Sequence, residues 1–142
     1  MFILQEKPID INPAKFSANP NIGALVSFEG IVRADQHDNH HVDILEYLAD
    51  APACNIEGNK IIAEACASFH LTEAICIQRI GQLKVGETAV WIGAWAPHRD
   101  DAFKGCRYII EEVKKRLLIW KKEHMTDGHK QWVRGQGTPT IG

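Results

Sequence analysis

The sequence predicts an α+β fold, and three of its features lead to this prediction. Segments 56–69 and 100–117 place apolar residues at helical spacing along one face. Several shorter segments have the alternating, β-branched or aromatic pattern of strands. Short turns around Gly81 and Gly86 join two of these segments as a hairpin. Strands and helices therefore mix through short loops, which indicates an antiparallel sheet with two main helices.

The first strand is expected at 2–5 and is followed by a loop rich in Pro and Asn. The next is interrupted by Gly30, and a glycine inside a strand often marks a bulge or a close backbone approach. Asp100 or Asp101 is expected to cap the second helix. A single domain is expected over 1–134, with a flexible tail over 135–142. The expected strands are 2–5, 23–33, 42–48, 74–80 and 88–95.

Composition limits the classes of protein to which the chain can belong. With 142 residues, 45% of them hydrophobic, one compact domain with its own core is expected. The apolar run 89–96 is far shorter than the roughly 20 residues of a membrane-spanning helix. The start of the chain shows no signal-peptide pattern, so the cytoplasm is expected. The four cysteines form no C-x-x-C pair and are expected to be reduced core thiols: Cys54, Cys66, Cys76 and Cys106.

Positive charge is concentrated in the last third of the chain. Residues 1–98 hold 6 Lys and Arg against 12 Asp and Glu, whereas residues 99–142 hold 10 against 6. This asymmetry indicates an anionic ligand or an acidic partner for the last third, or simply a solvated helix face.

His98 and Arg99 stand where the second helix is expected to begin. Unpaired backbone N–H groups and the helix dipole favour an anion there, and a small phosphorylated ligand would suit such a site. Lys114 lies at the edge of the apolar stripe beside two further cations, so partial burial and a lowered pKa are expected for it. It is thus a candidate proton donor or nucleophilic amine. Arg33 closes a strand, where its guanidinium can grip a phosphate.

Three alternatives carry less weight. The loop with His37, His40 and His41 could ligate a metal, but its spacing matches no defined site. A cysteine nucleophile is disfavoured because Cys66 and Cys106 lie on apolar helix stripes. A nucleic-acid surface would use a basic set interleaved with aromatic residues, but the overall acidic charge opposes it; that set is Lys104, Arg107, Lys114, Lys115, Trp120, Lys121, Lys122 and Trp132.

The sequence resembles the catalytic (large) subunit family of molybdopterin synthase from about residue 23 to residue 133. The resemblance is carried by blocks in order: Phe28-x-Gly30-x-Val32-Arg33, Leu45-Glu46-Tyr47, Arg79-Ile80-Gly81-x-Leu83, Ala96-x-His98-Arg99-x-x-Ala102-Phe103, Lys114, Trp120-Lys121-Lys122-Glu123 and Trp132-Val133. The sequence departs from the family pattern at 48–55 and at Gln78, where the family has a histidine before the arginine.

This resemblance implies an α/β hammerhead-type fold and a sulfurtransferase of molybdenum cofactor biosynthesis. The enzyme would convert cyclic pyranopterin monophosphate into the molybdopterin dithiolene. The sulfur would arrive as a thiocarboxylate on the C-terminal Gly-Gly of a small ubiquitin-like carrier subunit. Two copies of the chain would form a homodimer inside a heterotetramer.

The resemblance also implies site residues. Lys114 and Lys121 match the catalytic lysines, and Phe28, Arg33, His98 and Arg99 match substrate-binding positions. No metal, cofactor, nucleic acid or membrane is expected. The alternative is a non-catalytic module that binds a ubiquitin-like partner or nucleic acid.

Overall fold

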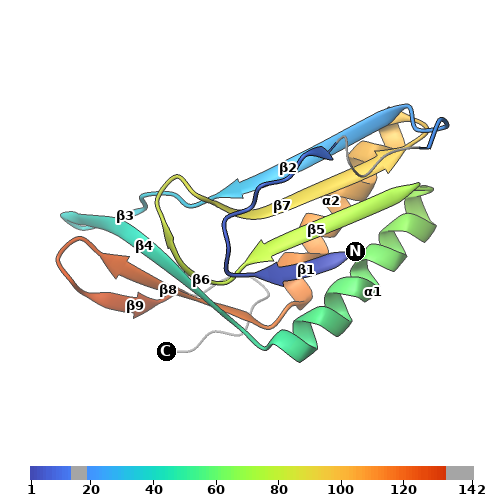
Figure 1. Ribbon diagram of the computed structural model, residues 1–142. Coiled ribbons are helices and arrows are strands. Elements are labelled where there is room, and N and C mark those ends of the chain that lie inside the picture. Colours follow the sequence, from blue (N-terminus) through green and yellow to red (C-terminus); the bar gives the residue numbers. More distant parts are fainter. Residues whose placement is uncertain (14–18, 134–142) are drawn as a thin grey trace.

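The structure is a computed structural model that describes residues 1–13 and 19–133 (Figure 1). It contains two sheets and two helices, which confirms the expected α+β class. The four-stranded sheet has the order β1-β5-β7-β2. Its first pair is parallel and the other two are antiparallel. Its strands are β1 (Phe2–Gln5), β2 (Ala24–Ile31), β5 (Glu73–Arg79) and β7 (Thr88–Ala96).

The five-stranded sheet follows the order β3-β4-β8-β9, and β6 pairs with β4 as well. Neither of the last two strands of the chain was predicted from the sequence. Residues 120–123 had been expected to follow the second helix within one basic segment, but they lie in β8. The strands are β3 (Gln36–His37), β4 (His40–Ala49), β6 (Gly81–Lys84), β8 (Ile119–Met125) and β9 (Lys130–Trp132).

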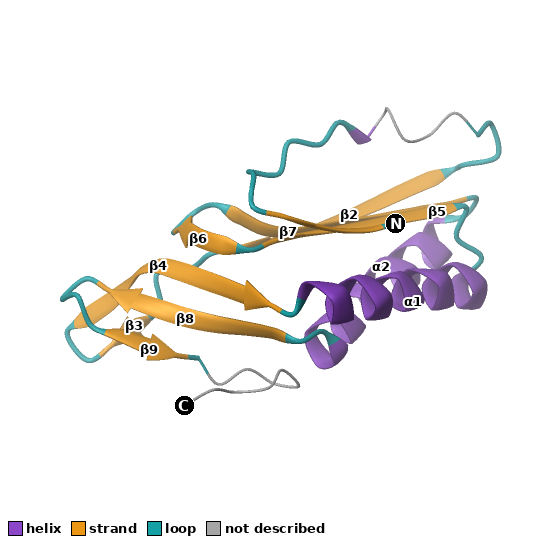
Figure 2. Ribbon diagram, turned by 60° about the horizontal axis from the view of Figure 1, so that its bottom comes forward, coloured by secondary structure: helices purple, strands orange, loops and turns teal. Residues whose placement is uncertain are grey.

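Both helices pack on one face of the four-stranded sheet, and the N-terminal segment covers the other face (Figure 2). The helix α1 (Ala51–Phe69) begins five residues earlier than predicted. The Asp50 side chain accepts a hydrogen bond from the Ala53 N–H, and Pro52 is compatible with a first turn.

The helix α2 (Arg99–Arg116) begins differently from the prediction. His98 occupies the cap position and makes no side-chain hydrogen bond there, so neither Asp100 nor Asp101 is the cap. Both carboxylates lie in the first turn instead, where the helix dipole favours negative charge.

The core lies between the helices and the four-stranded sheet. Ile61 of α1, Ile109 of α2 and Ile92 of β7 are fully buried in it. A second cluster on the opposite face contains Trp91 and Trp95. The helices therefore hold one end of the sheet rigidly, and α2 ends beside the second sheet.

Two sequence predictions about the strands are confirmed and one is refined. The register between β2 and β7 shifts between Gly30 and Ile31, which is the expected bulge. The antiparallel pairing of β5 with β7 confirms the hairpin. The connection between them is more than a turn, because it contains β6, which pairs with β4 of the other sheet.

The tail expected over 135–142 lies outside the described residues. Among the residues that are described, no helix combines the length and the apolarity needed to cross a membrane.

Candidate active site

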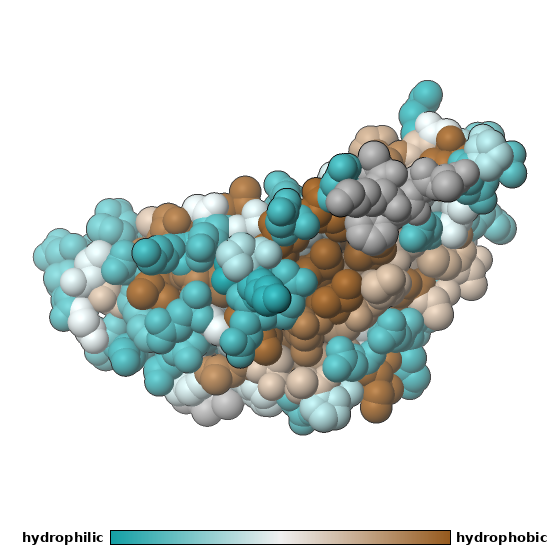
Figure 3. Space-filling view, in the orientation of Figure 1, coloured by the Kyte–Doolittle hydropathy of each residue, from teal (hydrophilic) through white to brown (hydrophobic). Residues whose placement is uncertain are grey.

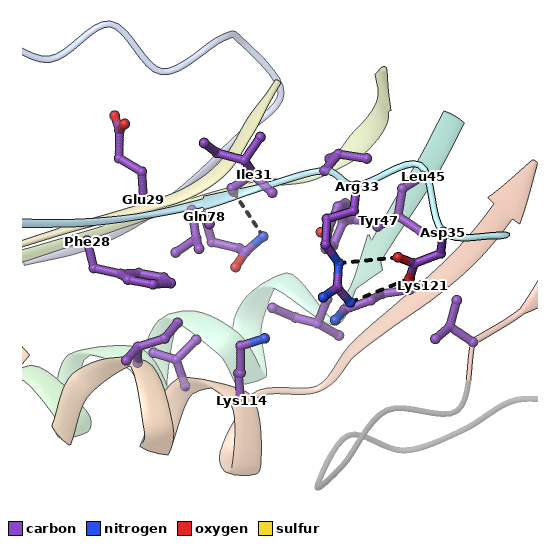
Figure 4. Close-up of a pocket in the computed structure, with 18 of the residues that line it drawn as sticks. Phe28, Glu29, Ile31, Arg33, Asp35, Leu45, Tyr47, Gln78, Lys114 and Lys121 are labelled. Carbon is purple, nitrogen blue, oxygen red and sulfur yellow. Dashed lines mark hydrogen bonds and ion pairs between the residues drawn. The ribbon is translucent and has the colours of Figure 1, made fainter. Parts of the chain in front are cut away.

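A cavity of about 550 Å³ opens where the end of β2, the strands β4 and β8 and the last turns of α2 meet (Figure 4). Four of the six predicted site residues line it, from three separate elements and the residues that follow β2. They are Phe28, Arg33, Lys114 and Lys121. These four side chains are up to 93 positions apart in the sequence.

Lys114 projects from the last turns of α2 toward the cavity (Figure 4). Its neighbour Val113 is buried in the core and fixes the rotation of the helix. Lys114 itself is exposed, so the expectation of partial burial at this residue is wrong. The helix turns Lys114 outward along the rim, where it can reach a charged ligand.

Lys121 is the half-buried lysine of the site. It lies on β8 opposite Tyr47 of β4, and its ammonium is 6.0 Å from the centroid of the Tyr47 ring. Burial lowers the pKa of Lys121 from its ordinary value of 10.5, and the positive charges of Lys114 and Arg33 lower it further. Burial also raises the pKa of Tyr47 to about 12, so this phenol stays protonated at neutral pH. Lys121 is therefore the group that gives up a proton more readily than a free lysine.

Arg33 follows β2 and reaches the mouth of the cavity. Its Nε lies 3.3 Å from an Asp35 carboxylate oxygen, and the Arg33 side chain is 82% exposed. Exposed ion pairs of this kind contribute little to stability, so a ligand anion can replace Asp35 at small cost. Phe28 of β2 extends along the wall of the same cavity (Figure 4).

His98 and Arg99 lie elsewhere in the chain. They border a separate shallow hollow with Gly23 and Pro97. Ala24, at the start of β2, pairs with Ala96, two residues before His98, whereas Arg33 follows the other end of β2. A strand rises about 3.3 Å per residue, so the stretch from Ala24 to Arg33 spans up to roughly 30 Å. One copy of the chain therefore does not bring His98 and Arg99 onto the same ligand as Arg33.

The cysteines do not form an activated thiol site. All four are free, as predicted, and Cys54, Cys76 and Cys106 are buried. Burial raises the pKa of Cys76 to about 12 and that of Cys106 to about 11, so both thiols stay protonated at neutral pH. None of the four is among the described residues that line the cavity.

Two of the three histidines of the 36–41 segment lie beside carboxylates. His37 lies 3.2 Å from Glu123, and His40 lies 3.6 Å from Asp127. Within residues 1–13 and 19–133, no group of three or more His, Cys, Asp or Glu side chains is arranged to hold a metal ion. The described part of the chain therefore gives the metal alternative no support.

Sequence reasoning missed three side chains of the cavity: Asp35 as a partner of Arg33, Tyr47 beside Lys121, and Gln78 on the wall. Asp35 was not among the expected site residues, Tyr47 stood only within a motif, and Gln78 stood only as a departure from the family pattern. The alternation of β4 is the one local signal that points to Tyr47. Gln78 has a usable signal too, because a polar residue within the buried strand 73–79 needs hydrogen-bond partners.

Comparisons with known proteins identify the family of the chain. The family described as "MoaE protein" matches residues 4–116. The molybdopterin synthase catalytic subunit of Synechococcus elongatus is 39% identical over 90% of this chain and 78% of its own length. That of Thermoplasma volcanium is 36% identical over 87% and 91%.

Solved structures show the same fold. Molybdopterin synthase from Staphylococcus aureus superposes with a TM-score of 0.86 at 32% identity, covering 94% of this chain and 96% of that one. A more distant neighbour from Helicobacter pylori, a complex of subunits 1 and 2 of the molybdopterin-converting factor, shares the fold with a TM-score of 0.79 at 17% identity. The chain belongs to the MoaE family, the catalytic subunits of molybdopterin synthase, and is therefore an enzyme of molybdopterin biosynthesis.

Proposed function

We propose that this chain transfers sulfur from a thiocarboxylated carrier subunit to cyclic pyranopterin monophosphate and so makes the molybdopterin dithiolene. The observation that carries the proposal is the convergence of Arg33, Lys114 and Lys121 on one cavity in a member of this family. Three cations suit a ligand that carries a phosphate and a reaction that develops negative charge. The buried thiols of the chain are protonated, so the sulfur comes from a partner.

The chemistry requires proton donors rather than a protein nucleophile. Attack of the thiocarboxylate sulfur on a carbonyl carbon forms a C–S bond and leaves an alkoxide that must take up a proton. Loss of that oxygen as water takes a second proton, and the adjacent carbon gives up a proton as the C=C bond forms. Hydrolysis of the resulting thioester by a water molecule then breaks the bond between the sulfur and the carrier's acyl carbon. The carrier leaves as a carboxylate, the sulfur stays on the substrate, and a second carrier delivers the second sulfur. Lys121, with its lowered pKa, is assigned the proton transfers, and Lys114 and Arg33 hold the anionic groups of the reactants.

The partner in this proposal is a small ubiquitin-like subunit that ends in Gly-Gly. The relatives are named catalytic subunits, which implies an enzyme of more than one subunit. An end without side chains fits a narrow cavity beside Lys114, and an acidic carrier face complements the basic last third of the chain. Carrier binding should weaken as salt rises and on deletion of the two glycines. If neither added salt nor deletion of the glycines weakens carrier binding, this mode of docking is wrong.

A homodimer forms the second part of the proposal. His98 and Arg99 lie at the Ala24 end of β2 and Arg33 follows its other end, a stretch of up to roughly 30 Å, so we assign them to the same phosphate only from a second copy. Co-expression of Lys114→Ala and Arg99→Ala chains tests this arrangement. Mixed dimers would contain one intact site of two and restore about a quarter of the activity when pairing is random. If both residues act within one chain, no activity returns.

The decisive experiment for the function is reconstitution. The purified chain, a thiocarboxylated carrier and cyclic pyranopterin monophosphate are expected to give the dithiolene product. The same carrier with an ordinary C-terminal carboxylate serves as the control and should give none. No product from the complete mixture would refute the proposed reaction. The proposed compartment is the cytoplasm, because four free cysteines suit a reducing environment.

A further inference from the structure

Gln78 is a buried polar residue on the wall of the cavity, and its amide is only half satisfied. It lies on β5, where Ala74 and Cys76 face the helices, and it continues the same face two residues further on. At that point the face borders the cavity, and Gln78 is only 5% exposed. A side chain so placed must satisfy its polar atoms from the protein or from a ligand.

The orientation of the amide follows from its partners. The Gln78 Nε2 donates to the carbonyl oxygen of Arg79 at 2.9 Å and to that of Ala89 at 3.2 Å. A carbonyl oxygen only accepts, so the nitrogen and not the oxygen must face these two groups. Both amide hydrogens are thereby used, and the side chain is held in one orientation.

Among the described residues, the side-chain oxygen of Gln78 has no partner of this kind, and it faces the cavity. Figure 4 shows the Gln78 oxygen turned away from the marked hydrogen bond, toward the side of the cavity where Lys114 lies. In residues 1–13 and 19–133, no group donates a hydrogen bond to this oxygen, and it is not sealed from solvent. The amide thus presents one fixed acceptor to whatever occupies the cavity.

The surroundings of this acceptor differ from those of the cations. Phe28, Val90 and Ile110 line the cavity as apolar neighbours, while the charged groups come from the end of β2, from α2 and from β8. The cavity therefore suits a ligand in two parts, a flat N–H-bearing ring and an anionic group. Apolar walls with a few placed polar groups are typical of sites for small heterocycles.

We propose that Gln78 is a specificity-determining residue whose Oε1 accepts a hydrogen bond from an N–H group of the substrate's pterin ring. This inference rests on the proposed function, which supplies the ring. The pterin carries N–H donors on its ring and its amino group, so it can satisfy the acceptor. An analogue that presents an acceptor or a methyl group there leaves the Gln78 oxygen unpaired or displaced.

The test compares two probes, cyclic pyranopterin monophosphate and inorganic phosphate, by equilibrium binding to the full chain. Gln78→Leu is expected to weaken binding of the pterin compound by about 10- to 100-fold and to leave phosphate binding unchanged. Arg33→Ala should weaken both. Gln82→Leu, at an exposed position on β6, is the matched control and should change neither. Thermal unfolding of each variant shows whether it is folded.

A second arm covers the case in which Gln78→Leu does not fold. Wild-type protein is then titrated with pterin analogues methylated in turn at each N–H group, and one of them should lose affinity by a similar factor. Gln78→Met, if folded, should bind that analogue and the parent equally.

The outcomes separate this inference from the proposed function. If Gln78→Leu binds the pterin as tightly as the wild type does, the assignment of Gln78 is wrong while the proposed function stands. If every methylated analogue binds like the parent, the assignment is wrong as well. Loss of carrier binding with retained pterin binding would place the acceptor on the carrier's tail and also overturn it. If wild-type protein binds no pterin at all, the proposed function itself fails.

Discussion

The two sheets of the molecule are held together by different forces. The four-stranded sheet packs Ile61, Ile92 and Ile109 into a closed apolar core against the helices. The five-stranded sheet has a smaller apolar cluster around the fully buried Leu83, and it adds pairs of polar side chains to its backbone ladders. Hydrophilic side chains gather over the five-stranded sheet at the left of Figure 3, whereas hydrophobic ones gather nearer the four-stranded sheet.

The polar pairs of the five-stranded sheet are specific. Glu123 is buried, and it accepts a hydrogen bond from Gln131 at 2.9 Å and lies 3.2 Å from His37. His124 lies 3.0 Å from Glu46 on the neighbouring strand. Such a sheet tolerates a half-buried lysine beside a cavity, which an apolar core does not. The helix-backed half therefore positions Lys114 and the end of β2 that leads to Arg33, whereas the polar sheet supplies the half-buried Lys121.

The largest effect is expected from the lysines of the cavity. Lys114→Ala or Lys121→Met should lower the rate of dithiolene formation by at least about 100-fold, because each removes a cation that acts on the reactants. The thermal midpoint of Lys114→Ala should stay nearly unchanged, since Lys114 is exposed. Lys104→Ala, an exposed lysine near the start of α2, is the control and should retain the activity. Turnover near that of the wild type by Lys114→Ala would refute its role.

The next largest effect is a loss of stability when a buried apolar side chain of the core is truncated. Ile109→Ala empties a fully buried position in α2 and should cost about 2–5 kcal/mol of unfolding free energy. Leu48→Ala in β4 removes a 39% exposed side chain and should cost within about 0.5 kcal/mol. Denaturant titration of both variants measures the difference. Equal costs would show that the destabilisation does not follow the burial of the side chain and would contradict the prediction.

A smaller effect is expected at the start of α2. Arg99→Ala should weaken binding of cyclic pyranopterin monophosphate by about 1.5–3 kcal/mol, the value of one charged hydrogen bond. Calorimetry measures this change, with Arg33→Ala as the companion from the cavity. If both variants bind the compound as tightly as the wild type does, neither Arg33 nor Arg99 binds its phosphate.

The smallest effect is expected in how the half-buried Lys121 makes the stability of the protein depend on pH. Burial lowers the pKa of Lys121, so between that lowered pKa and about 10.5 the unfolded chain binds more protons than the folded protein. Lys121 therefore destabilises the fold at neutral pH, and this cost disappears as the pH rises through that window. Lys121→Met should be more stable than wild type at pH 7, and its advantage should shrink toward pH 10.5.

Denaturant unfolding at several pH values tests this prediction. Lower stability of Lys121→Met at pH 7 would mean that the contact of Lys121 with the Tyr47 ring outweighs the cost of burial.

Local patterns in the sequence were sufficient for the helix-backed half of the fold. The apolar spacing in 56–69 and 102–117 predicted both helices, and Gly30 predicted the bulge in β2. The same patterns did not identify β8, because Trp120, Lys121 and Lys122 carry no strand alternation of apolar and polar side chains. Glu123 is buried in that strand only because His37 and Gln131 pair with it.

Some properties of the site could likewise be predicted from the sequence, and others could not. Composition and motifs in the sequence by themselves determined which side chains bear the chemistry, since charge and residue type are local properties. Only the tertiary structure decided that Lys121 rather than Lys114 is half-buried, and that His98 and Arg99 lie far from Arg33. Burial, pKa and proximity depend on which strands pair, and the pairing of β4 with β8 joins residues 70 or more positions apart. No local pattern contains that information, because a strand's neighbours are chosen by the packing of the whole chain.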